Sequence, residues 1–465
     1  MIALKDVSFQ YEGCEEGVHE IDLTVRDGEC VVLTGPSGGG KTTLTRLING
    51  LAPSYYQGTK KGDIWINDTE IASLPAWRIG QEIGSVFQDP KSQFFSSELA
   101  GEVAFACENY GMAKQEIRER TDEAIASLGL EALRARPLDV LSSGEKQRVA
   151  VASVYALRPH TYVCDEPTAN LDSEGAVRLA DILRKLKDEG NTLIIAEHRL
   201  AWLSGIADRF VYVSGGGTIQ WEKTPAQMRE LSEEERKRYG LREITETEPS
   251  LPGVPESAGK ESLFCRNLTC RRKKALIFED RNLSLPVGKI TALTGKNGAG
   301  KTTLAMVLAG LQKQSSGEIC IGGRSLSAAK RRKAVWYSSN DTGTQFFTTS
   351  VADELLLHTD ASPGRLERAR ALLKTLGLYA YKDAHPAALS GGQKQRLSIA
   401  CGLLSDREIL LFDEPTSGLD GGNMRKIANL LTEAAAEGKT IGVITHDKEF
   451  MQACCDFRWE FELPL

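Results

Sequence analysis

The chain has 465 residues, of which 41% are hydrophobic and 26% are charged. This balance is close to the globular average, so it excludes a wholly disordered or collagen-like chain and predicts two large domains or three smaller ones. The net charge of −6 argues against a protein whose whole surface binds nucleic acid.

The sequence carries no sign of a membrane span or of secretion. No apolar run approaches the roughly 20 residues that a membrane-spanning helix needs, and acidic residues occur too early for a signal peptide. The ten cysteines form no CxxC pair, so they indicate neither a zinc site nor a disulfide framework, and we expect most of them to be buried apolar residues. We therefore expect a cytosolic protein that reaches a membrane only through a partner.

The predicted elements alternate between strands and helices. Segments 4–13 and 18–29 alternate polar and apolar residues, which predicts an antiparallel region at a sheet edge. Short runs rich in β-branched residues then alternate with helical stretches such as 43–50 and 116–130. This order predicts an α/β fold with a largely parallel sheet flanked by helices. The expected parallel strands are 30–34, 83–87, 162–164, 290–294 and 409–412.

The chain repeats itself, which indicates a duplicated domain. GPSGGGKTT at 35–43 matches GKNGAGKTT at 295–303, LSSGEKQR at 141–148 matches LSGGQKQR at 389–396, and DEPTANLD at 165–172 matches DEPTSGLD at 413–420. The spacing of 23 residues from Ser142 to Asp165 recurs from Ser390 to Asp413. Only the interval between the lysine of the first motif and the serine of the second motif differs. It is 101 residues from Lys41 to Ser142 and 89 residues from Lys301 to Ser390.

The boundary between the two copies is also readable. A charged segment that begins with TPAQMRELSEEERKRYG is followed by TETEPSLPGVPESAGKES, which is poor in apolar residues and has the composition of a linker. We therefore place the first domain at 1–225, the linker at 226–260 and the second domain at 261–465.

Both copies contain a phosphate-binding loop of the form G-x-x-x-x-G-K-[ST] between a predicted strand and a predicted helix. Its glycines let successive backbone N–H groups face one centre, and the helix that follows adds its positive end. The lysine would reach the β- and γ-phosphates, and the following threonine would place a hydroxyl on Mg²⁺. The nucleotide-binding residues are Gly35, Ser37, Gly38, Gly39, Gly40, Lys41, Thr42 and Thr43, with Gly295, Asn297, Gly298, Ala299, Gly300, Lys301, Thr302 and Thr303 in the second copy.

Acidic residues and a histidine follow the later strands of each copy. Asp165 and Asp413 end apolar strands, where they can hold the Mg²⁺ shell with Thr42 and Thr302. Glu166 and Glu414 come next and are candidates to orient or deprotonate the attacking water. An Asp-Glu pair can also be a simple helix cap and a single histidine is usually structural, but His198 and His446 each lie 33 residues after the aspartate. We assign both histidines as γ-phosphate contacts.

With LSGGQKQR added to these motifs, nearly the whole chain resembles the ABC ATPase family. The resemblance implies two tandem P-loop domains, each with a parallel core, an antiparallel β edge and a helical subdomain. It also implies two ATP molecules, each held between the phosphate loop of one domain and the signature motif of the other. The first site would combine Lys41, Thr42, Gln88, Asp165, Glu166 and His198 with Ser390, Gly391 and Gly392, with Gln88 also near the metal; the second would combine Lys301, Thr302, Asp413, Glu414 and His446 with Ser142 and Gly144.

The second site departs from the family pattern in three places. Asn340 stands where the family has a glutamine, and Tyr11, which resembles the adenine-stacking aromatic residue, has no aromatic counterpart near Arg271 and Arg272. The signature LSSGE has Ser143 and Glu145 where the family has glycine and glutamine. Since misplacing a water- or metal-orienting group by about 1 Å costs around 10²-fold in rate, we expect unequal sites, with the first faster.

The segment 86–111 resembles the energy-coupling-factor branch of ABC importers, and TQFFTTSVADELLL at 344–357 repeats part of it. The resemblance implies integral membrane partners, a scaffold and a substrate-binding component, on the cytoplasmic face of the membrane. The candidate partner contacts are Phe94, Phe95, Val103, Phe105 and Phe346, with ordinary core positions as the alternative for Phe94 and Phe346. We expect an importer of a micronutrient such as a vitamin or a metal ion, with no nucleic acid partner.

Two other functions remain open. One is a double ATPase that acts on ribosomes, a class that also lacks membrane spans but typically has a long, charged, helical linker. Here three prolines interrupt the segment, at Pro249, Pro252 and Pro255. The other is a DNA-repair ATPase, but the 101- and 89-residue intervals leave no room for the large insertions of that class.

Overall fold

The computed structural model describes all residues except 14–15, 170, 256–260, 273–274, 358–361 and 462–465. The chain divides into two compact units whose boundary lies between Glu246 and Thr247. Cys14, one of the ten cysteines, lies outside the described residues, as do the last five residues of the predicted linker. Of the nine cysteines that are described, all but Cys454 are buried.

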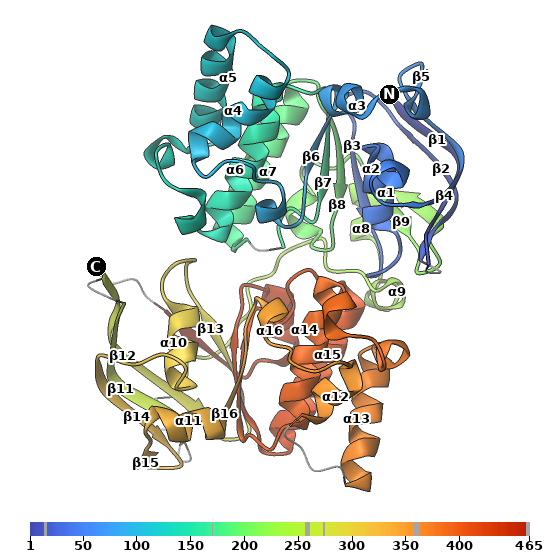
Figure 1. Ribbon diagram of the computed structural model, residues 1–465. Helices are drawn as coiled ribbons and strands as arrows, with labels where there is room; N and C mark the ends of the chain where they lie inside the picture. Colours follow the sequence, from blue (N-terminus) through green and yellow to red (C-terminus); the bar gives the residue numbers. More distant parts are fainter. Residues whose placement is uncertain (14–15, 170, 256–260, 273–274, 358–361, 462–465) are drawn as a thin grey trace. The chain divides into compact units, whose positions relative to one another are not determined.

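The first unit contains two sheets (Figure 1). One is antiparallel with the strand order β2-β1-β4-β5, and the other has the order β10-β9-β3-β8-β7-β6 and is parallel except for the β9–β10 pair. The predicted antiparallel edge and parallel core are therefore confirmed. The strands are β1 (Ile2–Tyr11), β2 (Gly17–Val25), β3 (Cys30–Thr34), β4 (Gly58–Ile66), β5 (Thr69–Glu70), β6 (Ile83–Val86), β7 (Thr161–Asp165), β8 (Thr192–Ala196), β9 (Arg209–Val213) and β10 (Ile219–Lys223).

The helices of the first unit pack on this parallel sheet. Every residue of β3 and β8 is buried, as the continuous apolar runs predict for central parallel strands. Helices α4, α5 and α6 lie away from the antiparallel sheet and form a helical subdomain (Figure 1). The helices are α1 (Lys41–Ile48), α2 (Leu51–Ser54), α3 (Ala76–Glu82), α4 (Leu99–Asn109), α5 (Lys114–Ser127), α6 (Ser143–Leu157), α7 (Ser173–Asp188), α8 (Pro225–Arg229) and α9 (Glu233–Tyr239).

The second unit repeats this architecture. Its antiparallel sheet has the order β12-β11-β14-β15, and its five-stranded sheet, β16-β17-β18-β13-β19, is wholly parallel. The elements are β11 (Glu261–Arg272), β12 (Ala275–Pro286), β13 (Ile290–Thr294), α10 (Lys301–Leu308), β14 (Ser316–Ile321), β15 (Arg324–Ser325), α11 (Ala328–Ala334), β16 (Val335–Ser338), α12 (Val351–Leu356), α13 (Pro363–Thr375), α14 (Gly391–Leu404), β17 (Ile409–Asp413), α15 (Gly421–Ala436), β18 (Thr440–Ile444), α16 (Lys448–Cys454) and β19 (Phe457–Glu460).

The segment predicted as a linker is ordered over much of its length. It contains most of α8 and all of α9, and Met228, Leu231, Leu241 and Ile244 are buried in a core cluster of the first unit. In the described part of the chain, no helix is both long and apolar enough to cross a membrane.

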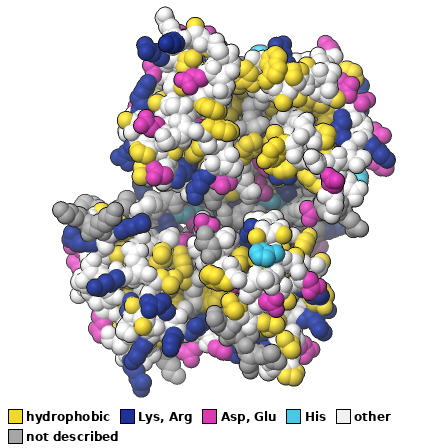
Figure 2. Space-filling view, in the orientation of Figure 1, with side chains coloured by type: hydrophobic (Ala, Val, Ile, Leu, Met, Phe, Trp, Pro, Cys, Tyr) yellow, Lys and Arg dark blue, Asp and Glu magenta, His cyan; other side chains and the backbone are white. Residues whose placement is uncertain are grey.

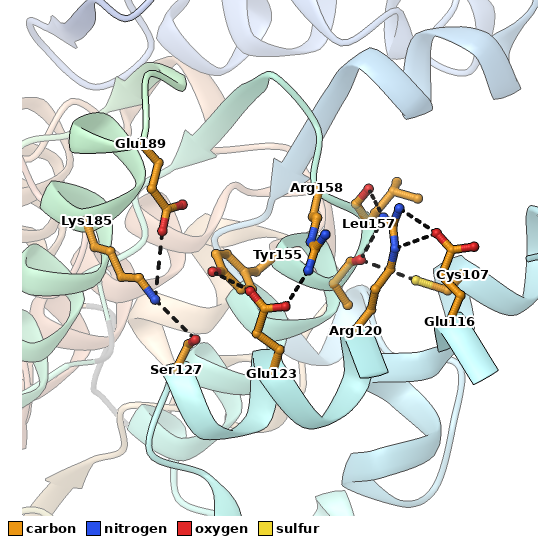
Figure 3. A network of polar contacts seen from close by, with 11 residues as sticks. Cys107, Glu116, Arg120, Glu123, Ser127, Tyr155, Leu157, Arg158, Lys185 and Glu189 are labelled. Atoms are coloured by element: carbon orange, nitrogen blue, oxygen red, sulfur yellow. Dashed lines mark hydrogen bonds and ion pairs between the residues drawn. The ribbon is translucent and has the colours of Figure 1, made fainter. Parts of the chain in front are cut away.

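A polar network joins α5 to the carboxyl end of α6 (Figure 3). Arg120 donates to the carbonyl oxygens of Ala156 and Leu157, at 3.4 and 3.1 Å, and forms an ion pair with Glu116. Glu123 on the same helix pairs with Arg158, which follows α6. Because these carbonyls end α6 and have no partner within the helix, a cation is well placed to bind them. The network therefore fixes α5 against α6, the helix that begins at the LSSGE motif.

Replacing Arg120 should release this attachment. Arg120→Met removes the donor to two helix-terminal carbonyls, so we expect the first unit to lose about 1–3 kcal/mol of its free energy of unfolding. The control is Arg118→Met, which removes an exposed arginine from the same helix. Differential scanning calorimetry should show a lower melting temperature for Arg120→Met alone, and equal melting temperatures would contradict this role.

Candidate nucleotide sites

The first phosphate loop connects β3 to α1. Gly35 has a φ of 137°, and a Cβ atom there would lie 2.0 Å from the carbonyl oxygen of Val213, so only glycine fits. The Nζ atom of Lys41 donates to the carbonyl oxygens of Gly35 and Pro36, at 3.1 and 2.8 Å. Burial lowers the pKa of Lys41, against the raising effect of the Glu166 carboxylate. The ammonium group is thus held within the loop, where a phosphate would meet it.

Five side chains meet beside this loop, one from α1 and four from the ends of neighbouring strands. Thr42 donates to Asp165 at 3.1 Å, and Gln88 donates to Glu166 at 2.8 Å. The Nε2 atom of His198 lies 3.4 Å from the same glutamate. They meet because β6, β7 and β8 are adjacent parallel strands whose carboxyl ends share one edge of the sheet. The structure therefore brings together the residues that the sequence assigns to the first site, apart from the signature residues.

Glu166 occupies a conformation that few residues adopt. Its φ is 43° and that of Glu414, its counterpart in the second unit, is 50°. The backbone N–H of each donates to the neighbouring strand, to Ala196 at 2.8 Å and to Ile444 at 2.9 Å. Left-handed backbone at a residue other than glycine persists only where the surroundings enforce it, and it is frequent at functional sites.

The sequence does not predict the buried carboxylate of Glu197, the residue before His198. Glu197 accepts hydrogen bonds from the backbone N–H groups of His198 and Arg199 and from the hydroxyl of Thr168. Burial raises the pKa of Glu197. In the second unit Thr445 stands in its place, and Thr416 donates instead to Asp447 at 2.7 Å. The signal that could have revealed this pair is the threonine in both DEPT motifs, which is fully buried in both units.

The second phosphate loop has the same construction. Lys301 donates to the carbonyl oxygens of Gly295 and Lys296, at 2.6 and 2.8 Å, and Thr302 donates to Asp413 at 2.7 Å. The Nε2 atom of His446 lies 3.8 Å from Glu414, slightly farther than in the first unit. The remaining predicted loop residues lie on the turns that precede α1 and α10 or at the start of these helices: Ser37, Gly38, Gly39, Gly40, Thr43, Asn297, Gly298, Ala299, Gly300 and Thr303.

The two sites differ at a residue that follows β6 in the first unit and β16 in the second. Gln88 lies two residues after β6 and Asn340 lies two residues after β16, so they occupy equivalent positions. Asn340 is exposed, and among the described residues the second unit shows no bond from its side chain to Glu414 to match the one from Gln88. Instead, the hydroxyl of Tyr337 donates to Asp413 at 3.3 Å.

The signature serines begin helices rather than joining the phosphate loops of their own units. Ser142 is the N-cap of α6 and Ser390 that of α14, each with a reciprocal bond to the third helical residue. In α6 that residue is Glu145, which accepts from the hydroxyl and the N–H of Ser142, both at 2.7 Å. Burial alone would raise the pKa of Glu145, but these hydrogen bonds outweigh it and lower the pKa. Gly144 and Gly391 lie in the first turns, with Gly392 beside Gly391.

The donor set at each site fits a hard divalent cation. A threonine hydroxyl and an aspartate carboxylate, which are oxygen ligands of the kind that Mg²⁺ prefers, lie within 3.1 Å in the first unit and 2.7 Å in the second. Burial, with a contribution from Glu166, raises the pKa of Asp165 to about 7. Burial also raises the pKa of Asp413, opposed by its bonds from Thr302 and Tyr337. These carboxylates are therefore placed where a positive charge would stabilise them.

The raised pKa of Asp165 predicts a pH-dependent stability in the absence of nucleotide and metal. The protonated carboxyl stabilises the fold below the unfolded pKa of about 4, and this contribution is lost as the pH rises through about 7. Asp165→Asn mimics the neutral form, so at pH 8 it should raise the free energy of unfolding by an amount on the order of 2–4 kcal/mol. The difference from the parent protein should shrink towards pH 5.

Thermal denaturation between pH 5 and pH 8 would measure this effect. The control is Asp188→Asn, which changes an exposed carboxylate at the end of α7. A constant difference between Asp165→Asn and the parent protein across this range would contradict the titration of Asp165.

The comparisons with known proteins agree with this geometry. The family model described as ABC transporter matches residues 18–169 and 278–417, one stretch in each unit. Among solved structures, the complex of the archaeal ribosomal stalk protein aP1 and the archaeal ribosome recycling factor aABCE1 contains a chain with a TM-score of 0.66. It is 24% identical and the match covers 98% of this chain and 87% of that one. At this identity the likeness shows the fold alone.

Sequence relatives extend over almost the whole chain. A Treponema denticola protein whose name proposes an ABC transporter ATP-binding protein is 38% identical over 462 residues, covering 98% of this chain and 94% of the relative. Bacillus subtilis YkoD, whose name proposes an HMP/thiamine import ATP-binding protein, is 32% identical and the match covers 98% of this chain and 89% of YkoD. The chain belongs to the ABC transporter family and is an ATPase with two ATP-binding domains in one polypeptide.

Proposed function

We propose that this ATPase is the energy-supplying subunit of an importer of the energy-coupling-factor type that carries a micronutrient such as a vitamin or a metal ion. The observation that carries the proposal is a pair of aromatic side chains, one in each unit, held on the surface in the same way. Phe95 is 74% exposed and Phe347 is 81% exposed. Large apolar side chains in such positions favour a protein partner.

Each exposed ring is fixed by a buried glutamate. Glu102 on α4 accepts from the backbone N–H groups of Phe95 and Ser96, both at 2.8 Å. Glu354 on α12 accepts in the same way from Phe347 and Thr348, at 2.8 and 2.9 Å. Because these bonds attach the backbone of the loop to a helix, each phenylalanine keeps its place at the surface. A position maintained so firmly in both copies supports a role in binding.

Other residues of these segments have structural roles. Phe94 and Phe346 are half-buried against the cores of their units. The prediction that Val103 contacts the partner is wrong, because this side chain is fully buried in the core. Phe105 stacks on Phe95 with ring centroids 4.8 Å apart. Figure 2 shows apolar side chains in several patches among charged ones on the visible face of each unit.

We propose that the partner is an integral membrane scaffold whose cytoplasmic helices bind these rings, together with a substrate-binding component. Two exposed acidic residues, Glu98 and Glu108, follow Phe95 in the sequence, which suits a basic, amphipathic helix. The relation to YkoD, with its proposed import role, supports this assignment. The protein would then lie peripherally on the cytoplasmic face of the membrane.

Removing the two rings should release the protein from its membrane partner. We expect Phe95→Ala with Phe347→Ala to lower co-purification of membrane subunits by at least about tenfold, since aromatic anchors each contribute on the order of 2 kcal/mol or more. ATP hydrolysis by the isolated chain should be unchanged. The matched control is Val177→Ala with Leu366→Ala, which removes one exposed apolar side chain from each unit. Equal recovery of membrane subunits with both double variants would contradict the proposal.

The alternative is a factor that acts on ribosomes. It is favoured by the fold likeness to the archaeal recycling factor. In this chain, however, the segment after the first domain is partly packed into that domain's core through Met228 and Leu231. Density-gradient fractionation of cell extract would separate the two functions. The importer subunit should float with the membranes, and co-sedimentation with ribosomes would favour the alternative.

We also propose that hydrolysis occurs at two composite sites of unequal rate. The first would take Lys41, Asp165 and Glu166 with the Ser390 signature, and the second would take the matching residues of the second unit with Ser142. Mg²⁺, when bound, would bridge the phosphates and neutralise their charge. Gln88 orients Glu166 in the first site, whereas the second has Asn340 in its place and a carboxylate, Glu145, on its signature serine.

The inequality predicts a difference between two matched variants. Glu166→Gln should reduce ATP turnover by about 10²-fold or more, and Glu414→Gln should reduce it several-fold at most, because the first site carries most of the flux. Steady-state phosphate release at saturating ATP measures both. Equal losses would contradict unequal sites.

A further inference from the structure

Arg46 belongs to an aromatic cluster of the first unit that has no counterpart among the described residues of the second. It lies on α1, five residues after Lys41, and its Nη1 atom donates to the hydroxyl of Tyr11 at 2.9 Å. Its guanidinium carbon lies 3.8 Å from the centroid of the Tyr56 ring. Tyr56 in turn packs edge-on against Tyr11, with centroids 6.5 Å apart. The cation is therefore bonded to one tyrosine and stacked on another.

This cluster fixes the ring of Tyr11 beside the phosphate loop. The hydroxyl of Tyr11 donates to Thr43 at 3.2 Å, which continues a chain of hydrogen bonds from Arg46 to the loop. Phe9 contacts the ring from another side, at a centroid distance of 4.9 Å. With its position set from three directions, the ring loses little freedom when a ligand stacks on it, which favours binding.

The fixed ring lines an open cavity of about 770 Å³. Its other walls come from residues at the carboxyl end of β1 and the amino end of β4, and from Pro53. The hydrogen bond from Tyr11 to Thr43 places this ring next to the phosphate-loop segment, where it can meet the base of a nucleotide bound through its phosphates. Aromatic faces of this kind stack on any nucleobase, because every base has a π-face.

In the second unit other residues stand at the positions of Tyr11 and Arg46. Asp6 and Asn267 share a φ of 48° and mark the same register in β1 and β11, so Arg272 occupies the place of Tyr11. Met306, five residues after Lys301, occupies the place of Arg46.

The loop that carries Tyr56 is also missing from the second unit. The glycines at 50 and 310 have φ values of 74° and 75°, and those at 62 and 317, next to equivalent carbonyl oxygens, have 74° and 90°. The interval between these landmarks is twelve residues in the first unit and seven in the second. The five extra residues account for Tyr56, so this cluster is a feature of one site and not a general property of the fold.

We propose that Arg46 and Tyr56 are positioning residues that hold Tyr11 for a nucleobase, so that recognition of the base is confined to the first site. The second site binds its nucleotide through the phosphates alone. This inference rests on the proposed ATP sites, and it gives the two sites different ligand requirements: the first needs a base, and the second needs only a polyphosphate chain.

The test compares ATP with inorganic tripolyphosphate, which has the phosphates but no base. Equilibrium binding is measured on the full chain carrying Lys301→Ala, which weakens the second site. Arg46→Met, which copies the second unit, should weaken ATP binding about five- to tenfold while leaving tripolyphosphate binding unchanged, since only a stacking and cation–π contribution is lost. Arg46→Lys should restore part of the ATP affinity, and Tyr56→Leu should resemble Arg46→Met.

The binding of tripolyphosphate also reports whether each variant is folded. If Arg46→Met weakened the binding of ATP and of tripolyphosphate equally, the inference would be overturned, because Arg46 would then support the phosphate loop or the fold. Unchanged ATP affinity in Arg46→Met would overturn it too, while leaving the ATP sites intact. A parent protein that binds neither ligand would instead remove the proposed sites themselves. Met306→Arg in a Lys41→Ala background is the control, and ATP binding there should not change.

Discussion

The structure depends on the burial of a carboxylate beside a lysine at the carboxyl edge of a parallel sheet. Asp165 and Asp413 end strands that are covered on both faces, and each accepts a hydrogen bond from the phosphate-loop threonine of its unit. Burial raises the pKa of both aspartates and lowers that of Lys41. Burying charged groups in this arrangement costs free energy unless a ligand balances their charges, so a bound cation and phosphate would stabilise the site.

Much of this could be predicted from the sequence. The phosphate loops, the acidic pairs and the histidines follow strands at fixed spacings, and parallel strands must bring their carboxyl ends to one edge. Local pattern and global fold agree at these positions. The parallel strands were therefore placed within a residue or two of their observed bounds.

The residues that sequence reasoning missed act through contacts between distant segments. Glu197 has no motif of its own, and its bond to Thr168 crosses 29 residues. Tyr337 reaches Asp413 only because β16 and β17 are adjacent. Arg46 has no motif of its own, and its role depends on its contact with Tyr56, which lies in a separate loop. Val103 lies on the buried face of α4, and hydrophobicity alone does not distinguish the two faces of this helix.

The glutamates that anchor the exposed rings have a mechanical consequence. Since Glu102 and Glu354 bind the backbone immediately at Phe95 and Phe347, each aromatic side chain is coupled to its helix through a short, stiff connection. A flexible loop would absorb a small displacement of the helix, but this connection transmits it. If α4 or α12 shifted during the ATPase cycle, the phenylalanine attached to it would therefore shift by the same amount, and so would any partner bound to that ring.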